Sequence, residues 1–240
     1  MIVDVLCIAA HPDDVEMTCA GTVLSLVDQG KTVAVIDLTK GELGTRGTPE
    51  IRLQEAEEGA RLMRLSARHN MGFKDGFFQN DEAHQKALIP WIRHFQPKIV
   101  LTNAVDDRHP DHGRGAALVT EACFYSGLRM IETTDPETGE AQAAHRPTYL
   151  YSFIQDRSLV PDFVVNVTPY WEQKLASIKA YKSQFFNPDS TEPQSYISGE
   201  PFMKFLESRH REHGHMINVE FGEGFMSKRM LGVDDLFALK

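Results

Sequence analysis

Residues 3–16 read Val-Asp-Val-Leu-Cys-Ile-Ala-Ala-His-Pro-Asp-Asp-Val-Glu, and they decide the fold class of this chain. The near-continuous apolar run Val3–Ala9 is typical of a strand that is buried on both faces of a sheet. Val15–Gln29 follows with a helical pattern that Gly30 ends. A buried strand, a polar turn and a helix in this order predict the first unit of an α/β fold.

The same alternation continues through the N-terminal half of the chain. Thr48 is a predicted N-cap with Pro49 at the first helical position, which starts a helix over Glu50–Leu65. We expect further strands at Thr32–Leu38, Asn70–Phe73 and Ile99–Asn103, and further helices at Ala83–Phe95 and His112–Tyr125. Strands that alternate with helices over short connections predict a Rossmann-like, mostly parallel sheet with helices on both faces.

The pattern changes after Thr133–Arg146, a polar stretch that we expect to form a long surface loop. The C-terminal half then has predicted strands at Tyr149–Ile154 and Phe163–Val167, and predicted helices at Tyr170–Phe185 and Pro201–Gly214. The tail Met216–Lys240 has a mixed pattern. These elements predict one α/β domain over residues 1–240 with a partly antiparallel C-terminal region.

The composition and charge of the chain exclude several classes of protein. Its 240 residues are 42% hydrophobic and 25% charged, as in a globular protein. The 25 Lys and Arg residues against 34 Asp and Glu residues give a net charge of −9, so we expect no nucleic-acid or membrane partner. Because no apolar run approaches the about 20 residues of a membrane span, and no secretory signal opens the chain, we expect a cytoplasmic protein. The three cysteines, Cys7, Cys19 and Cys123, lack paired spacing and favour buried, reduced thiols.

Two clusters of histidine and aspartate follow predicted strands. His11-Pro12-Asp13-Asp14 comes after the first strand, and Asp106-Asp107-Arg108-His109-Pro110-Asp111-His112 comes after Ile99–Asn103. The carboxyl ends of parallel strands meet at one edge of a sheet, and ligands bind there in open α/β folds. We therefore expect the two clusters to form one site.

These clusters contain the residue types of a catalytic metal site. His11 and Asp14 are three residues apart on a turn that enters a helix, so both side chains can reach one cation. Together with a histidine of the second cluster they give two histidines and one carboxylate, and zinc enzymes use three protein ligands plus an open position. The remaining carboxylates and histidine supply the base and acid of metal-assisted hydrolysis. The alternatives are an aspartate that only caps the helix, a non-haem iron oxygenase, and a binding module without turnover.

Arg52 and the loop Gly41–Gly47 are weaker signals. Arg52 lies in the first turn of a predicted helix, where the helix dipole disfavours a cation, so both a functional role and a surface salt bridge explain it. The loop follows the second strand but matches neither the dinucleotide fingerprint nor the P-loop. We interpret it as a substrate-side loop, with an ordinary turn as the alternative.

The two clusters resemble the motifs of the zinc-dependent N-acetylglucosaminide deacetylases of the PIG-L/LmbE type. The resemblance rests on residues 10–16 and on His109-Pro110-Asp111-His112, and it runs over nearly the whole chain. It includes residues 37–48, Glu50-Ile51-Arg52 and the tail stretch 222–229. The tail stretch and the glycine loop look most like the bacillithiol-biosynthesis deacetylases of that family.

The resemblance implies a set of metal ligands and a base. His11, Asp14 and His112 match the ligands of one Zn²⁺ per chain, or of another divalent metal. Asp13 matches the general base that acts on the zinc-bound water.

The resemblance also implies partners for the substrate. His109, paired with Asp111, matches the charged residue that stabilises the oxyanion or protonates the leaving amine. Arg52 and Arg108 match arginines that are associated with the active site and are expected to bind substrate. Tyr196 is a candidate for the tyrosine that assists the oxyanion in some members.

The implied activity is hydrolysis of the acetyl group from a small amino-sugar conjugate. N-acetylglucosaminyl-L-malate, an intermediate of bacillithiol biosynthesis, is the preferred substrate, because its malate carboxylates suit arginine-bearing loops. N-acetylglucosamine and short chitin oligomers are the alternative substrates. The resemblance further implies a homo-oligomer, a hexamer.

Overall fold

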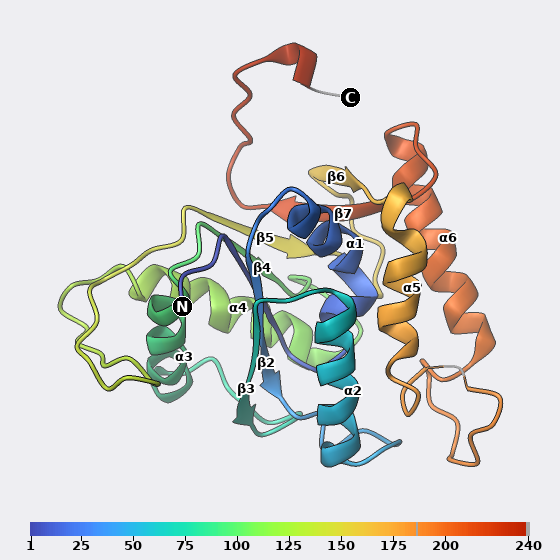
Figure 1. Cartoon of the computed structure of the whole chain (residues 1–240), viewed down its shortest axis with the longest axis horizontal. Helices are drawn as coiled ribbons and strands as arrows, with labels where there is room; N and C mark the ends of the chain where they lie inside the picture. Colours follow the sequence, from blue (N-terminus) through green and yellow to red (C-terminus); the bar gives the residue numbers. More distant parts are fainter. Residues whose placement is uncertain (186, 239–240) are drawn as a thin grey trace.

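The computed structural model describes residues 1–185 and 187–238, so Phe186 and the last two residues of the tail lie outside the described part. Within that part, seven strands form one sheet in the order β3-β2-β1-β4-β5-β7-β6 (Figure 1). The strands are β1 (Val5–Ala9), β2 (Val33–Thr39), β3 (Ala67–Phe73), β4 (Ile99–Thr102), β5 (Tyr149–Phe153), β6 (Phe163–Asn166) and β7 (Gly222–Ser227). The α-helices are α1 (Asp14–Asp28), α2 (Pro49–Leu62), α3 (Glu82–Phe95), α4 (Pro110–Tyr125), α5 (Trp171–Lys179) and α6 (Glu200–Met216). Two 3₁₀ helices are η1 (Thr168–Tyr170) and η2 (Leu236–Ala238).

The direction of the strands confirms the predicted fold class. β1 pairs in parallel with β2 and β4, β2 with β3, and β4 with β5. β7 runs antiparallel to both of its neighbours, β5 and β6. The sheet is therefore mostly parallel, with an antiparallel C-terminal edge.

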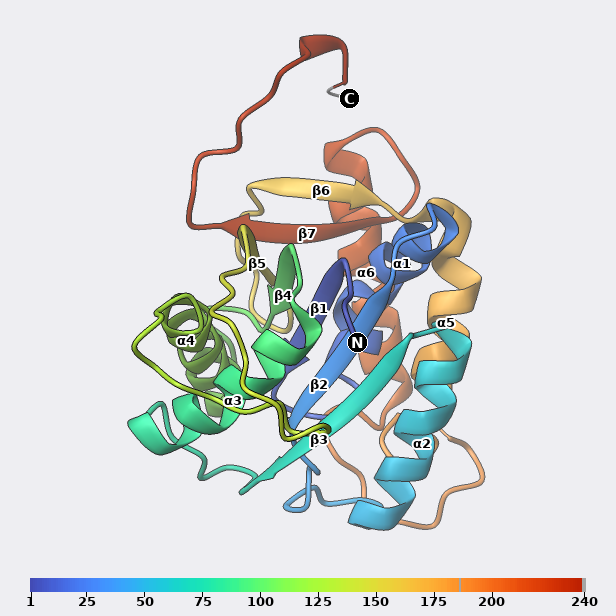
Figure 2. The same cartoon turned by 60° about the vertical axis from the view of Figure 1, so that its left-hand side comes forward.

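Helices cover both faces of the sheet (Figures 1 and 2). Successive side chains of β1 point to opposite faces, so Leu6 and Ile8 enter one core while Cys7 enters the other. The first core contains residues of α3 and α4, and the second contains residues of α1. α5 packs against α1 and α2, while α6 packs against β6 and β7. The three cysteines are free and buried, as expected.

The strand order places a crevice beside β1. The chain extends the sheet from β1 through β2 to β3 on one side, and then returns to add β4 on the other side of β1. At such a switch point the loops after the two central strands leave in opposite directions, and a ligand can bind between them. Both histidine and aspartate clusters of the sequence follow these two strands.

β7 is the main difference from the sequence expectation. Its residues lie in the tail, for which the sequence indicated only a mixed pattern. Gly222 and Gly224 are poor strand formers and Glu223 is charged, so no strand signal stands out. The strand nevertheless lies inside the sheet, where Ser152 of β5 faces Met226 and Val164 of β6 faces Gly224.

The remaining boundaries differ by a few residues. β3 begins at Ala67 rather than Asn70, because polar residues of this edge strand hide its apolar pattern. The expected helix Tyr170–Phe185 ends at Lys179, and turns follow it. The predicted cap of α2 is confirmed: the hydroxyl of Thr48 accepts a hydrogen bond from the amide of Ile51 at 3.3 Å.

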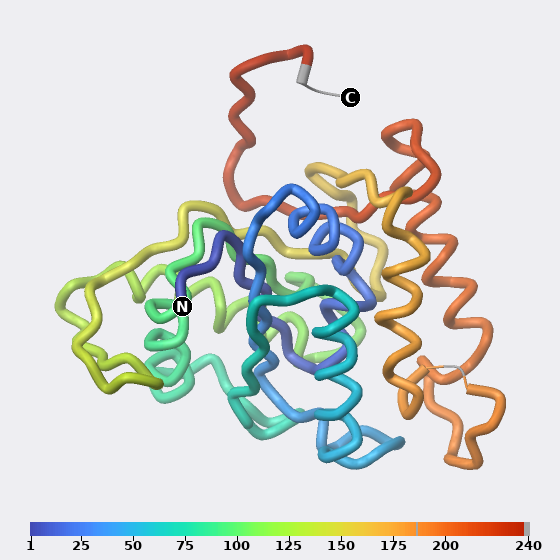
Figure 3. Tube along the Cα trace, viewed as in Figure 1, coloured from blue at the N-terminus to red at the C-terminus, as the bar shows by residue number. Residues whose placement is uncertain are grey.

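Beyond β7 the chain leaves the sheet as an extended arm that ends at η2 (Figure 3). Its apolar side chains are exposed, with Met230 at 97% and Phe237 at 98% of their full accessible surface. The homo-oligomer implied by the resemblance stays a prediction. In the described residues, no helix is both long and apolar enough to cross a membrane.

Candidate active site

The loop after β1 has an unusual backbone at Asp13. This residue has φ 108° and ψ −24°, in the left-handed region that residues other than glycine rarely occupy. Such strained residues cluster at functional sites. Asp13 stands at the N-cap position of α1, yet its side chain accepts no capping hydrogen bond, so capping does not explain this aspartate.

Asp14 is fixed by hydrogen bonds from three sides. Its Oδ2 accepts from the amide of His11 at 3.0 Å and from the side-chain amide of Asn103 at 2.9 Å. Its Oδ1 accepts from Nε2 of Gln155 at 2.9 Å. The carboxylate is fully buried, so its two oxygens are held in one orientation toward the neighbouring histidines.

The loop after β4 enters α4 through His109, which is the N-cap residue, followed by Pro110 at the first helical position. His112 therefore lies in the first turn of the helix. Its Nδ1 lies 2.5 Å from Oδ2 of Asp107, and its Nε2 lies 3.2 Å from Oδ1 of Asp14. Asp107 thus fixes the ring so that Nε2 faces Asp14.

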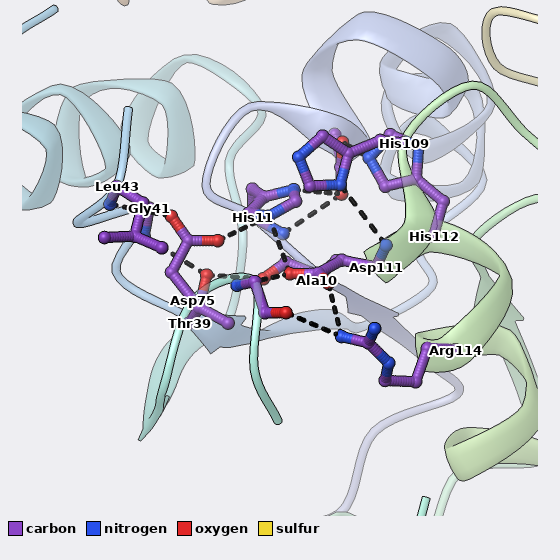
Figure 4. A network of polar contacts seen from close by, with 12 residues as sticks. Ala10, His11, Thr39, Gly41, Leu43, Asp75, His109, Asp111, His112 and Arg114 are labelled. Carbon is purple, nitrogen blue, oxygen red and sulfur yellow. Dashed lines mark hydrogen bonds and ion pairs between the residues drawn. The ribbon is translucent and has the colours of Figure 1, made fainter. Parts of the chain in front are cut away.

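His11 is held in the same manner (Figure 4). Its Nε2 lies 3.0 Å from Oδ1 of Asp75, while its Nδ1 lies 3.7 Å from Oδ2 of Asp14. Each of the two histidines therefore turns one ring nitrogen toward Asp14 and the other toward a second carboxylate. Histidines that bind metals commonly have such a carboxylate on the remote nitrogen, because it sets the tautomer and the ring orientation.

His11, Asp14 and His112 suit a metal ion by their chemistry. Two imidazole nitrogens and a carboxylate oxygen are zinc ligands, and all three side chains are buried, with their remaining polar atoms held by protein partners. Donor atoms of His11, His109 and His112 also lie within 4.8 Å of one another, as do those of His11, Asp75 and Asp111. We call His11, Asp14 and His112 the donor set.

The charges of this cluster shift its pKa values strongly. Burial alone would lower the pKa of His112, but Asp14 and Asp107 outweigh it and raise this pKa to about 9. Burial opposes charge on His11 as well, and hydrogen bonds to Asp111, Asp14 and Asp75 raise its pKa well above the usual range. The histidines in turn hold the pKa of Asp14 well below its usual range against the effect of burial. A cation is therefore favoured at this position, and a bound metal would replace the two protons.

Asp13 differs from Asp14 in both environment and pKa. Burial raises the pKa of Asp13 to about 7, although the guanidinium of Arg52 lowers it. Nη2 of Arg52 donates to Oδ2 of Asp13 at 3.1 Å and to the carbonyl of Pro12 at 2.7 Å. The same arginine donates through Nη1 to the carbonyl of Gly41 at 3.1 Å. Arg52 is therefore buried in the site and does not form the surface salt bridge of the alternative interpretation.

Gly41 permits this arrangement. It has φ 65°, and a Cβ atom added to it would lie 1.7 Å from Nη1 of Arg52. Only glycine leaves room for the guanidinium at this point. The glycine loop after β2 therefore holds Arg52 against Asp13, a role that the sequence pattern did not indicate.

His109 and Asp111 are placed differently from the expectation. Nδ1 of His109 accepts a hydrogen bond from the backbone amide of Asp111, while the carboxylate of Asp111 binds Arg114 at 2.7 Å and the amide of Gly76 at 2.8 Å. Burial and the charges of His11 and His112 lower the pKa of His109 to about 4. The expected pairing of His109 with the Asp111 carboxylate is absent, and the structure favours a neutral His109, because positive neighbours surround its ring.

Arg108 and Tyr196 lie together at the rim of the site. The guanidinium of Arg108 lies 4.2 Å from the ring centroid of Tyr196, and its Nε lies 3.4 Å from Oδ2 of Asp156. The hydroxyl of Tyr196 donates to Oδ1 of Asp156 at 2.9 Å. Asp156 therefore holds both side chains, and Arg108 keeps about half of its side chain exposed.

A cavity of about 410 Å³ joins these elements. Its wall includes the donor set, Asp13 and His109. Three arginines also line it, Arg46, Arg52 and Arg108, together with Asp75, Gly76 and Tyr196. This volume is within the range of small-molecule sites. Asp111 contacts two residues of the cavity wall: its Oδ2 accepts from the amide of Gly76 and lies 3.5 Å from Nε2 of His11.

Sequence reasoning missed several residues that orient the donor set. Asp107 lies inside the second motif, but spacing alone could not single it out from Asp106. Asn103 directly follows β4, and Gln155 lies two residues after the end of β5. Both are at the edge of the sheet where ligands bind, and that position was their only signal. Asp75 lies in the loop after β3, far from both motifs, and no sequence feature indicated it.

Comparisons with known proteins identify a family and several relatives of this chain. A family model described as "PIG-L: GlcNAc-PI de-N-acetylase" matches residues 6–123. A diacetylchitobiose deacetylase of Thermococcus kodakarensis is 28% identical over 192 residues, which cover 75% of this chain and 70% of that protein. A probable N-acetyl-alpha-D-glucosaminyl L-malate deacetylase 2 of Bacillus anthracis is 26% identical over 228 residues, which cover 82% and 93%. The solved structure of the conserved protein TT1542 from Thermus thermophilus is 30% identical, with a TM-score of 0.83 and coverage of 97% of this chain and 98% of that one.

Proposed function

This chain belongs to the PIG-L family, and from that premise we propose that it is a zinc-dependent deacetylase of an N-acetylglucosamine conjugate. One observation carries the proposal: a second buried carboxylate, Asp13, lines the cavity beside the donor set, with its Oδ2 bonded to Arg52. A binding site needs the donor set alone. Hydrolysis at neutral pH needs, in addition, a base whose pKa lies near the working pH.

The residues divide the reaction among them. A zinc ion held by His11, Asp14 and His112 would supply Lewis acidity for the attacking water and the amide carbonyl. Oδ2 of Asp13 is held by Arg52, which leaves Oδ1 to take the proton of the water. With a pKa near 7, Asp13 can return this proton to the nitrogen of the leaving amine. Water adds to the acyl carbon, the C–N bond breaks, and the products are acetate and a free amino sugar.

His109 serves the oxyanion as a neutral donor in this proposal. Its Nδ1 is engaged by the backbone of Asp111, so Nε2 carries the ring proton toward the cavity. A neutral imidazole can donate a hydrogen bond to the oxygen that becomes charged in the transition state. This role replaces the charged histidine that the resemblance implied.

We propose N-acetylglucosaminyl-L-malate as the substrate, and Arg108 as the residue that binds its malate group. Arg46 and Arg52 are buried and already donate to protein groups, Arg46 to the hydroxyl of Ser190. Arg108 alone among these three arginines is half exposed at the rim. A diacetylated chitobiose is the second candidate, because the exposed ring of Tyr196 at the same rim offers a stacking surface for a second sugar.

The test compares three substrates with the zinc-loaded protein: the malate conjugate, N-acetylglucosamine and diacetylchitobiose. The readout is amine release at equal substrate concentrations. We expect Arg108→Ala to lower kcat/KM for the malate conjugate about 10- to 100-fold, since it removes hydrogen bonds to a charged group. The same variant should change the rate on N-acetylglucosamine little. Arg157→Ala is the matched control, because Arg157 is an exposed neighbour that pairs with Asp106 outside the cavity.

Each outcome of this test has a distinct meaning. A preference for diacetylchitobiose that Arg108→Ala leaves intact would transfer the proposal to the second candidate. An absence of amine release from all three substrates, with zinc bound, would contradict the proposed deacetylase. Zinc-independent consumption of oxygen with iron would favour the oxygenase alternative.

A further inference from the structure

Arg46, in the glycine loop after β2, is a buried arginine in the wall of the active-site cavity. Only 2% of its surface is exposed, and it lines the cavity beside Thr45. The backbone on both sides of it is fixed. Its carbonyl accepts from Nε2 of Gln184 at 2.8 Å, and Gly47, which has φ 71°, donates its amide to Oε1 of Glu192 at 2.9 Å. The loop therefore holds the guanidinium in one place before any ligand binds.

The guanidinium of Arg46 has unused hydrogen-bond donors. Its Nη2 donates to the hydroxyl of Ser190, which is a neutral partner. Its Nε is buried without a hydrogen-bond partner, since the closest carboxylate oxygen among the described residues, Oε2 of Glu192, lies 3.7 Å away. Within residues 1–185 and 187–238, its Nη1 donates to no other residue. Buried donors are normally bonded, so this guanidinium suits an acceptor that a ligand brings.

The other two arginines of the cavity have closer carboxylates. Nη2 of Arg52 donates to Asp13 at 3.1 Å, and Nε of Arg108 lies 3.4 Å from a carboxylate of the loop after β5. Glu192 is farther from Arg46, and 43% of the Glu192 side chain is exposed, so water weakens the attraction between them. Burial of Arg46 strengthens its attraction for an anion inside the cavity. Of the three arginines, Arg46 therefore offers an anionic ligand the largest gain.

A guanidinium is suited to one class of ligand group. Its planar fork of N–H donors matches the two oxygens of a carboxylate or a phosphate, which it binds by charge-assisted hydrogen bonds. A neutral sugar hydroxyl would leave the charge of Arg46 without a close anion. The chemistry of the site therefore favours an oxyanion as its ligand.

We propose that Arg46 is a specificity-determining residue that binds an anionic group of the sugar conjugate, a carboxylate or a phosphate, and that Glu192 competes with this group. The inference rests on the proposed function and deepens it, since it concerns the part of the substrate that distinguishes one conjugate from another. For the malate conjugate, which has a carboxylate at each end of its malate, Arg46 binds one and Arg108 the other. Both arginines line the same cavity, as this assignment requires.

The test measures kcat/KM of the zinc-loaded protein for N-acetylglucosaminyl-malate, N-acetylglucosamine 1-phosphate and the neutral methyl glycoside of N-acetylglucosamine. Arg46→Met should lower the ratio of an anionic substrate to the neutral one by about 10- to 100-fold, because hydrogen bonds to a charged group are lost. Arg46→Lys keeps the charge without the fork, so its ratio should lie between those of wild type and Arg46→Met. A loss on the malate conjugate alone identifies the ligand group as a carboxylate, and a loss on the 1-phosphate alone identifies it as a phosphate.

Glu192→Gln should change the same ratio in the opposite direction. Removal of the competing carboxylate should raise the ratio about two- to fivefold, which corresponds to the strength of an exposed ion pair. If Arg46 and Glu192 only held the loop in place, both variants would change the rates in the same direction and would affect the neutral glycoside equally. Because Glu192 is exposed, this variant also keeps the test valid if Arg46→Met does not fold.

Arg61→Met is the matched control for the loss of a positive charge. Arg61 is 69% exposed on α2, where it pairs with Glu58 at 2.6 Å outside the cavity. This variant should keep the ratio of the wild type. A ratio that neither Arg46→Met nor Glu192→Gln changes, with the substrates still hydrolysed, would overturn the anion site and leave the proposed function intact.

A binding measurement separates the two proposals. Calorimetry of the same three compounds with the zinc-loaded protein reports on the anion site without turnover. If none of them is hydrolysed, yet an anionic compound binds about tenfold or more tightly than the glycoside and Arg46→Met removes this preference, the proposed function fails and the anion site stands. A preference that persists in Arg46→Met would place the anion elsewhere in the cavity and would overturn the role of Arg46.

Discussion

Two buried clusters of charged groups contact α1, and they differ in how completely the protein satisfies them. In the cluster around Glu223, one carboxylate accepts from the amides of Gly21 and Thr22, from the hydroxyl of Thr22 and from Nζ of Lys174, all at 2.6–2.9 Å. We call this the Glu223 cluster. In the donor set at the N-terminal end of the same helix, Asp14 instead faces two histidines, whose pKa values it raises.

The two clusters have different roles: the Glu223 cluster stabilises the fold, whereas the donor set is suited to bind a cation. α1 is interrupted at Cys19, which has φ −134° and ψ 16°, and Glu223 binds the amides just after that interruption. The Glu223 cluster pairs one anion with one cation and serves as an internal cap that joins β7 to α1. The donor set gathers two histidines around one carboxylate, and an external cation fits it better than two protons do. Burial and charge alone would not distinguish the two clusters.

The largest expected effect comes from breaking the donor set and its base separately. His112→Ala removes a ligand, so the protein should lose both zinc and amine release. Asp13→Asn leaves the ligands and should keep zinc while turnover falls about 10²- to 10⁴-fold, since only the base is lost. Metal content after dialysis, measured beside the rate, checks this division. Loss of zinc in Asp13→Asn would show that the ligands and the base are assigned wrongly.

The Glu223 cluster should respond in stability rather than in chemistry. Lys174→Met leaves a buried carboxylate without its cation, so the free energy of unfolding should fall by about 3–5 kcal/mol. Urea denaturation of the metal-free protein measures this change. Lys204→Met is the control, because Lys204 pairs with Glu200 on the exposed surface of α6 and should give no measurable change. A stability equal to wild type in Lys174→Met would remove the contrast between the clusters.

A smaller effect, on zinc affinity, is expected at Asp107, which contacts the ligand His112. Asp107 orients His112, so Asp107→Asn should weaken zinc binding about 10- to 100-fold. Competition with a zinc chelator measures the affinity. Asp106→Asn is a neighbouring control, because Asp106 is 59% exposed and pairs with Arg157 at the surface. Equal zinc affinities of the two variants would contradict the supporting role of Asp107.

The smallest expected effect is a pH dependence near the Glu223 cluster. Burial, and then the charge of Lys174, lowers the pKa of His210 well below 6.5. Below pH 6.5 the unfolded chain therefore binds a proton that the native state excludes. The free energy of unfolding then decreases as the pH is lowered, by up to about 1.4 kcal/mol per pH unit. Urea denaturation between pH 5 and 8 should show a shallower decline for His210→Gln. His215→Gln, on the exposed side of the same helix, should keep the decline of the wild type.

The sequence predicts the parts of this molecule that depend on local pattern. The parallel half follows from apolar strands alternating with helices, and the two motifs follow from residue type and spacing after β1 and β4. β7 could not be predicted, because Gly222 and Gly224 weaken its pattern and its strand exists only through pairing with β5 and β6. Asp75 and Gln155 could not be predicted either, since they reach the site by the folding of distant segments. Glu223 belonged to a stretch recognised only by resemblance, and the structure gives it a structural role.

The central claim is that the donor set and Asp13 together hydrolyse an acetamide with water. The most direct test incubates the zinc-loaded protein with N-acetylglucosaminyl-malate in ¹⁸O-labelled water, and then measures free amine and labelled acetate by mass spectrometry. We predict equal amounts of both products, with one ¹⁸O atom in each acetate, and the loss of both products in Asp13→Asn. Amine release without labelled acetate, or full labelling at the wild-type rate in Asp13→Asn, would contradict the account.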